Sequence, residues 1–133
     1  TRGSTDGAGN AAQFSNPTGI AVSPDGGVLF VADHENHKIR RVEVGVGDAA
    51  QFYNPATGEV TSIAGSGGGG DVDGVGDAAQ FYNPAGLAIS PDGDALFVTD
   101  FSNNKLRRVE VATGAVTRAT QRSFPTQLAS LSA

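Results

Sequence analysis

Two histidines at positions 34 and 37 are the clearest candidates for side-chain chemistry, because they flank Glu35 and Asn36 in one short polar stretch. Imidazole and carboxylate groups are common metal ligands, so a metal site is one interpretation of this cluster. No third ligand is evident, and the chain contains only these two histidines. A partner-binding loop is therefore the favoured interpretation, since recognition residues are commonly carried by loops on a rigid scaffold.

A second candidate lies in a glycine-rich stretch, where Asp71, Asp73 and Asp77 offer three carboxylates. Oxygen ligands at such close spacing are typical of calcium loops. The bidentate glutamate that completes an EF-hand loop is missing, because position 82 is Tyr. We therefore expect these aspartates to cap turns and expect no bound cofactor, with calcium at Asp71, Asp73 and Asp77 kept as the alternative.

The composition narrows the classes of function. The 133 residues carry a net charge of −5, which disfavours nucleic acid as the main partner. Cysteine is absent, so disulfides, zinc–thiolate sites and thiol nucleophiles are excluded. No apolar run approaches the roughly 20 residues of a membrane helix. The compartment stays open, with an extracellular location preferred. No nucleophile, base and orienting residue can be grouped, so we lean against an enzyme.

The elements that position these residues belong to a repeat. Residues 6–44 and 73–111 align without gaps, and 26 of the 39 positions are identical. The offset of 67 residues is inflated, because residues 45–55 duplicate the eleven residues 74–84. Without that duplicate the period is 67 − 11 = 56. We interpret residues 45–55 as an insertion into a hairpin, where Phe52 and Tyr53 would be exposed for contact with another chain.

Each repeat is expected to form four short strands, because apolar runs alternate with glycine-rich turns such as Ser23-Pro24-Asp25-Gly26. A pair of arginines recurs at the same place in each repeat, as Arg40 and Arg41 and as Arg107 and Arg108. We interpret these side chains as solvated strand faces. Phe14 and Phe81 are assigned to the core between repeats. The expected strands are 19–23, 28–32, 38–44 and 59–64, followed by 86–90, 95–99, 105–111 and 115–119.

Short strands at blade-length spacing favour a β-propeller over a sandwich. The pattern DG-x-G-x-AAQF-x-NP-x-G, then SPDG, LFVAD and Asn36-His37-Lys38-Ile39-Arg40, resembles the NHL-repeat family of β-propellers. The second copy has Asn103-Asn104-Lys105-Leu106 at that place, so its histidine is lost. The resemblance implies an all-β fold with two four-stranded blades, which is a partial propeller that needs further blades from the same or other chains.

We expect a single domain over 1–133, with blade 1 at about 6–64, blade 2 at about 73–119 and an unrelated tail at 120–133. The expected function is a non-enzymatic binding or scaffold module for a protein or glycan. Its partners would be other protein chains or further blades, and three copies would make a six-bladed ring. The alternative is a fragment of a propeller enzyme of lyase or lactone hydrolase type, with most of its active site outside this chain. The candidate partner-binding residues are His34, Glu35, Asn36, His37, Phe101, Ser102, Asn103 and Asn104.

Overall fold

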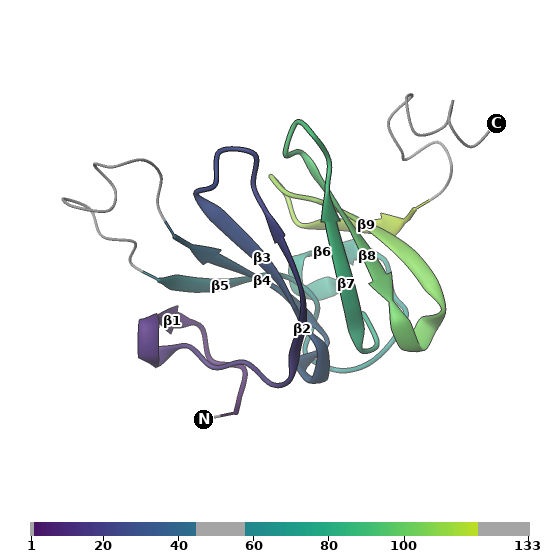
Figure 1. The fold of residues 1–133 in the computed structure, drawn as a ribbon. Helices are drawn as coiled ribbons and strands as arrows, with labels where there is room; N and C mark the ends of the chain where they lie inside the picture. The colour runs from purple at the N-terminus through teal and green to yellow at the C-terminus, as the bar shows by residue number, and fades with distance from the viewer. Residues whose placement is uncertain (1, 45–57, 120–133) are drawn as a thin grey trace.

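The computed structural model describes residues 2–44 and 58–119, and this part of the chain is all-β with no α-helix. It forms two antiparallel sheets of five strands each (Figure 1). No helix in the described ranges is long and apolar enough to span a membrane. The inserted copy 45–55, including Phe52 and Tyr53, and the tail 120–133 lie outside the described residues.

The first sheet has the strand order β1-β5-β4-β3-β2. Its strands are β1 (Gly7–Ala8), β2 (Pro17–Val22), β3 (Val28–Asp33), β4 (Lys38–Glu43) and β5 (Glu59–Ala64). The second sheet repeats this order as β6-β10-β9-β8-β7. Its strands are β6 (Gly74–Val75), β7 (Pro84–Ile89), β8 (Ala95–Asp100), β9 (Lys105–Glu110) and β10 (Ala115–Arg118).

The eight expected strands are confirmed with small shifts at their ends, but the expected four strands per sheet are too few. The glycine-rich segment that leads each repeat returns along the outer strand of its own sheet and pairs with it. Gly7 lies opposite Val60 in the first sheet, and Gly74 lies opposite Val116 in the second. A two-residue strand leaves no period-two pattern in the sequence, so this fifth strand is invisible to pattern analysis.

The turns that join the inner strands follow the chemistry of their residues. Asp25 accepts hydrogen bonds from the Gly27 N–H at 2.8 Å and from the Ser23 hydroxyl at 2.7 Å, while Gly26 adopts a φ of 77°. Asp92 accepts the same pair of hydrogen bonds in the second sheet, from Ser90 and Asp94. These side-chain bonds close the β2–β3 and β7–β8 hairpins and fix their registers.

The two sheets pack face to face, with β2 and β3 of the first against β7 of the second (Figure 1). One apolar cluster spans the junction and includes Ala21, Phe30, Ala32, Leu96 and Val98. The backbones approach closely there, because a Cβ on Gly19 would come within 2.2 Å of the Ala85 carbonyl oxygen. Glycine at position 19 therefore sets the spacing between the sheets.

Equivalent residues of the two sheets differ in burial. Leu96 and Val98 are fully buried, whereas their counterparts Leu29 and Val31 are only half-buried. Leu87 packs against the core, whereas its counterpart Ile20 is 58% exposed. The cause is that the second sheet is covered on this side by the first sheet, while nothing in the described chain covers the first. We call the face carrying Ile20, Val22, Leu29 and Val31 the outer face of the first sheet.

Candidate functional site

The predicted partner-binding loops lie at one end of the two sheets, between β3 and β4 and between β8 and β9. Each begins with a single 3-10 turn, His34–Asn36 in η2 and Phe101–Asn103 in η4. Each then ends on a left-handed residue, with φ of 55° at His37 and 54° at Asn104. Asparagine and histidine both adopt this conformation more often than most residues, so either can end the turn.

A buried arginine supports each loop from below. Arg40 has no exposed side-chain area and donates hydrogen bonds to Asp33 and Asp6, each at 2.7 Å. It also donates to the backbone carbonyls of Gln13 at 2.7 Å and Thr5 at 3.0 Å. One guanidinium therefore joins the end of β3 to the segment that leads the repeat. Its five fixed donors suit it to this task better than lysine.

The second sheet repeats this arrangement. Arg107 donates to Asp100 and Asp73, each at 2.8 Å, and to the carbonyls of Gln80 and Val72, each at 3.0 Å. Its guanidinium lies over the Phe81 ring, 5.2 Å from the ring centre, as that of Arg40 lies over Phe14 at 4.9 Å.

The interpretation of Arg40 and Arg107 as solvated strand faces is therefore wrong. It fits only their neighbours Arg41 and Arg108, which stay partly exposed beside Glu43 and Glu110. The arginines sit on strands whose pattern mixes charge with apolar residues, and their carboxylate partners come from distant segments. Sequence reasoning did carry one usable signal, because Asp6, Asp33 and Arg40 all recur as Asp73, Asp100 and Arg107.

The two histidines are engaged within the chain. His37 Nδ1 accepts a hydrogen bond from the Asn83 N–H at 2.9 Å, and its ring meets Tyr82 edge-on, with the ring centres 5.3 Å apart. His34 Nδ1 lies 3.2 Å from the Pro84 carbonyl oxygen, which fixes Nδ1 as the protonated nitrogen because a carbonyl can only accept. Both histidines thus join the loop of the first sheet to the second sheet.

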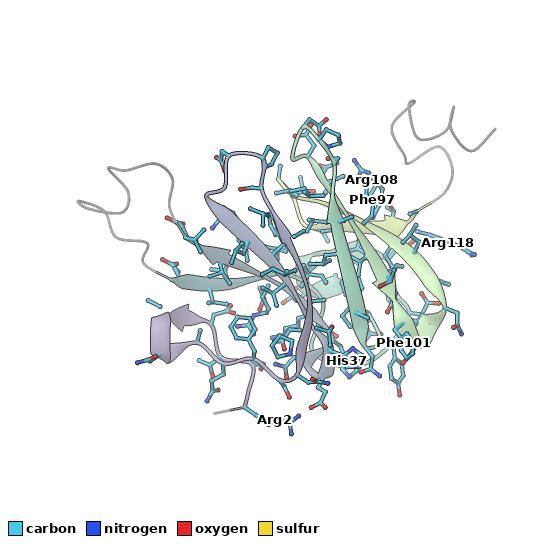
Figure 2. All side chains as sticks on the ribbon, viewed as in Figure 1. Arg2, His37, Phe97, Phe101, Arg108 and Arg118 are labelled. Atoms are coloured by element: carbon cyan, nitrogen blue, oxygen red, sulfur yellow. The ribbon has the colours of Figure 1, made fainter. Side chains whose placement is uncertain are left out.

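Within the described residues their counterparts in the second sheet meet no third sheet, although the Phe101 ring lies 6.4 Å from the His34 ring. Phe101, which replaces His34, is 65% exposed, and Asn104, which replaces His37, is also exposed. Figure 2 shows His37 and Phe101 at the same end of the molecule. The loop of the second sheet thus has more exposed side chains than the loop of the first.

The remaining predicted binding residues mostly hold their own loops. Glu35 pairs with Arg2 and accepts a hydrogen bond from the Ser15 hydroxyl. Asn36 donates to Asp33 and to the Gly3 carbonyl, and Asn103 donates to Asp100 and to the Gly70 carbonyl. Ser102 is exposed and accepts a hydrogen bond from the Asn83 side chain. Only Phe101, Ser102 and Asn104 present exposed side chains in the second loop.

Burial lowers the pKa of His37 below its ordinary value of 6.5; the nearby His34 lowers it further, while Asp100 opposes the shift. Below about pH 6.5 the unfolded chain then binds a proton that the folded chain resists, so stability is full above that pH and falls as the pH drops. Protonation of Nδ1 would also remove the hydrogen bond from Asn83.

We expect the thermal midpoint of the chain to fall as the pH is lowered from about 6.5 towards 5, and we expect His37→Asn to flatten that dependence. Asparagine is chosen because it already occupies the equivalent left-handed position 104. Differential scanning fluorimetry across this pH range measures the effect. An unchanged pH dependence in the variant would show that His37 is not the titrating group.

Two aspartates of the glycine-rich stretch 71–77 are paired with basic side chains of the protein itself. Asp71 forms an ion pair with Lys105, and Asp73 with Arg107, while Asp77 lies in the short turn η3 (Gly76–Ala78). The hydrogen bond from Lys105 lowers the pKa of Asp71. Across residues 2–44 and 58–119 no group of three His, Asp or Glu side chains is placed to hold a metal ion. Calcium would have to displace Lys105 and Arg107 from their partners.

An open groove lies beside the outer face of the first sheet. It has a volume of about 300 Å³ and is lined by Phe14, Pro17, Thr18, Gly19, Ile20 and Val31. The equivalent surface of the second sheet is covered by the first sheet, where Thr18 donates a hydrogen bond to the Ala85 carbonyl at 3.0 Å. In the second sheet this surface is covered by a neighbouring sheet. In the first sheet the same surface is the open groove, because no sheet of the described chain covers it.

Comparison with protein families gives a match to the NHL repeat over residues 14–42. SUPPRESSOR OF QUENCHING 1, a chloroplast protein of Arabidopsis thaliana, is 34% identical over 112 residues, covering 84% of this chain. NHL repeat-containing protein 2 of Homo sapiens is 30% identical over 115 residues, covering 86%. The chain spans only 9% and 14% of the length of these two relatives.

Solved structures share the fold. Two auxiliary nutrient binding proteins, from Bacteroides thetaiotaomicron and Bacteroides ovatus, superpose with TM-scores of 0.65 each, at 22% and 20% identity. In both cases 90% of this chain aligns with 27% of the other. At such low identity the likeness concerns the architecture alone, and it agrees with a propeller-like arrangement of the sheets.

Proposed function

We propose, from the premise that residues 14–42 are an NHL repeat, that this chain is a non-enzymatic interaction module made of two propeller blades. Its partners are further blades, supplied by the same protein or by another chain, and its exposed loop at Phe101–Asn104 adds a polar and aromatic edge for binding. The first sheet corresponds to one blade and the second sheet to the next.

The observation that carries this proposal is the difference in burial between equivalent positions. Leu87 and Ile89 pack against the core because a sheet covers them, while their counterparts Ile20 and Val22 are 58% and 50% exposed. Exposed apolar faces of this kind mark surfaces that bind protein. A repeat that stacks on its neighbours gains much of its stability from the interfaces between repeats.

The enzyme alternative finds less support. A lyase or lactone hydrolase site would need carboxylates and histidines that face a shared cavity, but the described carboxylates at Asp33, Asp73 and Asp100 are bound to arginines. His34 and His37 are bound to the backbone of the second sheet. The groove is lined by apolar and small residues together with one threonine.

A covalent tandem of two copies of this chain, joined by a flexible linker, tests the proposal. We expect the tandem to unfold at a higher temperature than the single chain, because one further sheet-to-sheet interface forms at high effective concentration. Ile20→Lys in the second copy of the tandem, which lies at the new interface, should remove most of the gain. Thermal unfolding followed by circular dichroism measures both midpoints.

The matched control is the same substitution in the first copy, where Ile20 stays at a free end. In a tandem that stays open it should leave the midpoint nearly unchanged, because this side chain is then exposed with or without the second copy. A tandem that unfolds at the same midpoint as the single chain would contradict the proposal that the faces bind blades.

A further inference from the structure

We infer that the occupant of the groove is a second copy of this chain, which docks the free side of its second sheet onto the outer face of the first sheet. This inference rests on the proposed function and names its partner. The two copies would repeat, between molecules, the junction that joins the two sheets within one molecule. We call the surface carrying Gly86, Ala88, Thr99 and Phe101 the outer face of the second sheet.

The junction within the chain supplies the template. Thr18 and Gly19 of β2 lie against the Ala85 backbone of β7, and His34 lies against the Pro84 carbonyl. Above them, the small residues Ala21 and Ala32 are buried in the cluster that also holds Leu96 and Val98. A flat surface of small residues on one sheet thus receives the branched residues of the next.

The outer face of the second sheet presents the same shape. Ala88 and Thr99 stand where Ala21 and Ala32 stand in the first sheet, and both are exposed. Gly86 stands where Gly19 stands, with no side chain to keep a neighbouring backbone away. The outer face of the first sheet in turn presents Ile20 and Val22 where the buried side of the second sheet presents Leu87 and Ile89. All of these side chains are uncharged, so docking buries no ion.

At two equivalent positions the second repeat carries a less polar residue than the first, which suits an apolar contact between two copies. Thr18, which donates to the neighbouring backbone within the chain, is replaced by Ala85, and His34 is replaced by Phe101. By repeat equivalence Phe101 of one copy meets the Pro17 side of the groove in the other. A ring that is 65% exposed would thereby enter a groove lined mainly by apolar groups.

This contact joins different faces of the two copies, so it propagates head to tail and closes only as a ring. Propellers hold about four to eight blades, which corresponds to about two to four copies of this chain. We expect sedimentation equilibrium to give a mass about two to four times the 13.4 kDa of one copy, falling on dilution. Ile20→Lys and Phe101→Lys should each return the mass to that of one copy.

Val75→Lys is the matched control, because Val75 is as exposed as Ile20, at 58%, but lies in β6 at the outer edge of the second sheet. It adds the same charge and should leave the mass unchanged. Circular dichroism checks that each variant keeps its β-structure. A single-copy mass for the natural sequence at all concentrations overturns the inference, as does an equal loss of mass in Val75→Lys. If the covalent tandem is nevertheless stabilised, the faces bind blades and the proposed function stands, and only the association of separate copies is lost.

Discussion

Replacing Arg40 with leucine is expected to lower the free energy of unfolding by about 3–5 kcal/mol, because it leaves the buried carboxylate of Asp33 without its cation. Both side chains have no exposed area, and the guanidinium also holds Asp6 and two backbone carbonyls. Urea unfolding followed by circular dichroism measures the loss.

Arg41→Leu is the control, since Arg41 is the next residue on the same strand but is partly exposed beside Glu43. A change within about 1 kcal/mol is expected there. The double variant Asp33→Leu/Arg40→Leu should be less destabilised than Arg40→Leu alone, because no unpaired charge remains buried. Equal losses for Arg40→Leu and Arg41→Leu would show that the buried ion pair is not a structural centre of the repeat.

Phe81→Ala is expected to cost about 3–5 kcal/mol, as is usual for a large buried aromatic side chain. Phe81 is fully buried in the cluster between the sheets, with Arg107 over its ring. Its repeat equivalent Phe14 is only half-buried and lines the open groove. Phe14→Ala should therefore cost clearly less in a chain kept monomeric by Ile20→Lys, because less apolar area returns to water.

The comparison of these two variants by urea unfolding isolates the effect of the neighbouring sheet, since the residue type and its place in the repeat are the same. If the two variants lose equal stability, the difference in burial between the two sheets has no energetic consequence. The assignment of Phe14 and Phe81 to a core between repeats would then need revision.

Much of the fold follows from the sequence because each inner strand carries its own pattern. The runs at 28–33 and 95–100 and the Ser-Pro-Asp-Gly turns are local signals, and all appear where they were expected. The strands β1 and β6 could not be predicted in the same way. They consist of two residues each, and their partners lie 53 and 42 residues away at Val60 and Val116.

The candidate site was harder to predict, because its residues act through distant contacts. His34 and His37 look alike in sequence as free loop side chains, yet both contact residues about 50 positions later. Arg40 sits in a run of charged residues that suggests exposure, and its burial depends on Asp6 from the start of the repeat. The alignment of the repeats shows that Phe101 stands where His34 stands. It does not show that His34 contacts the second sheet, which only the structure reveals.

The most direct test of a docking surface on the first sheet is a filtered nuclear Overhauser measurement on a mixed sample. One population carries labelled Ile and Val methyl groups, and the other carries labelled Phe rings. We predict cross-peaks between the Phe101 ring of one copy and the methyl groups of Ile20 or Val31 of another, which vanish on dilution. The absence of these cross-peaks in an associated sample, or their replacement by contacts to Val75, would contradict the assigned surface.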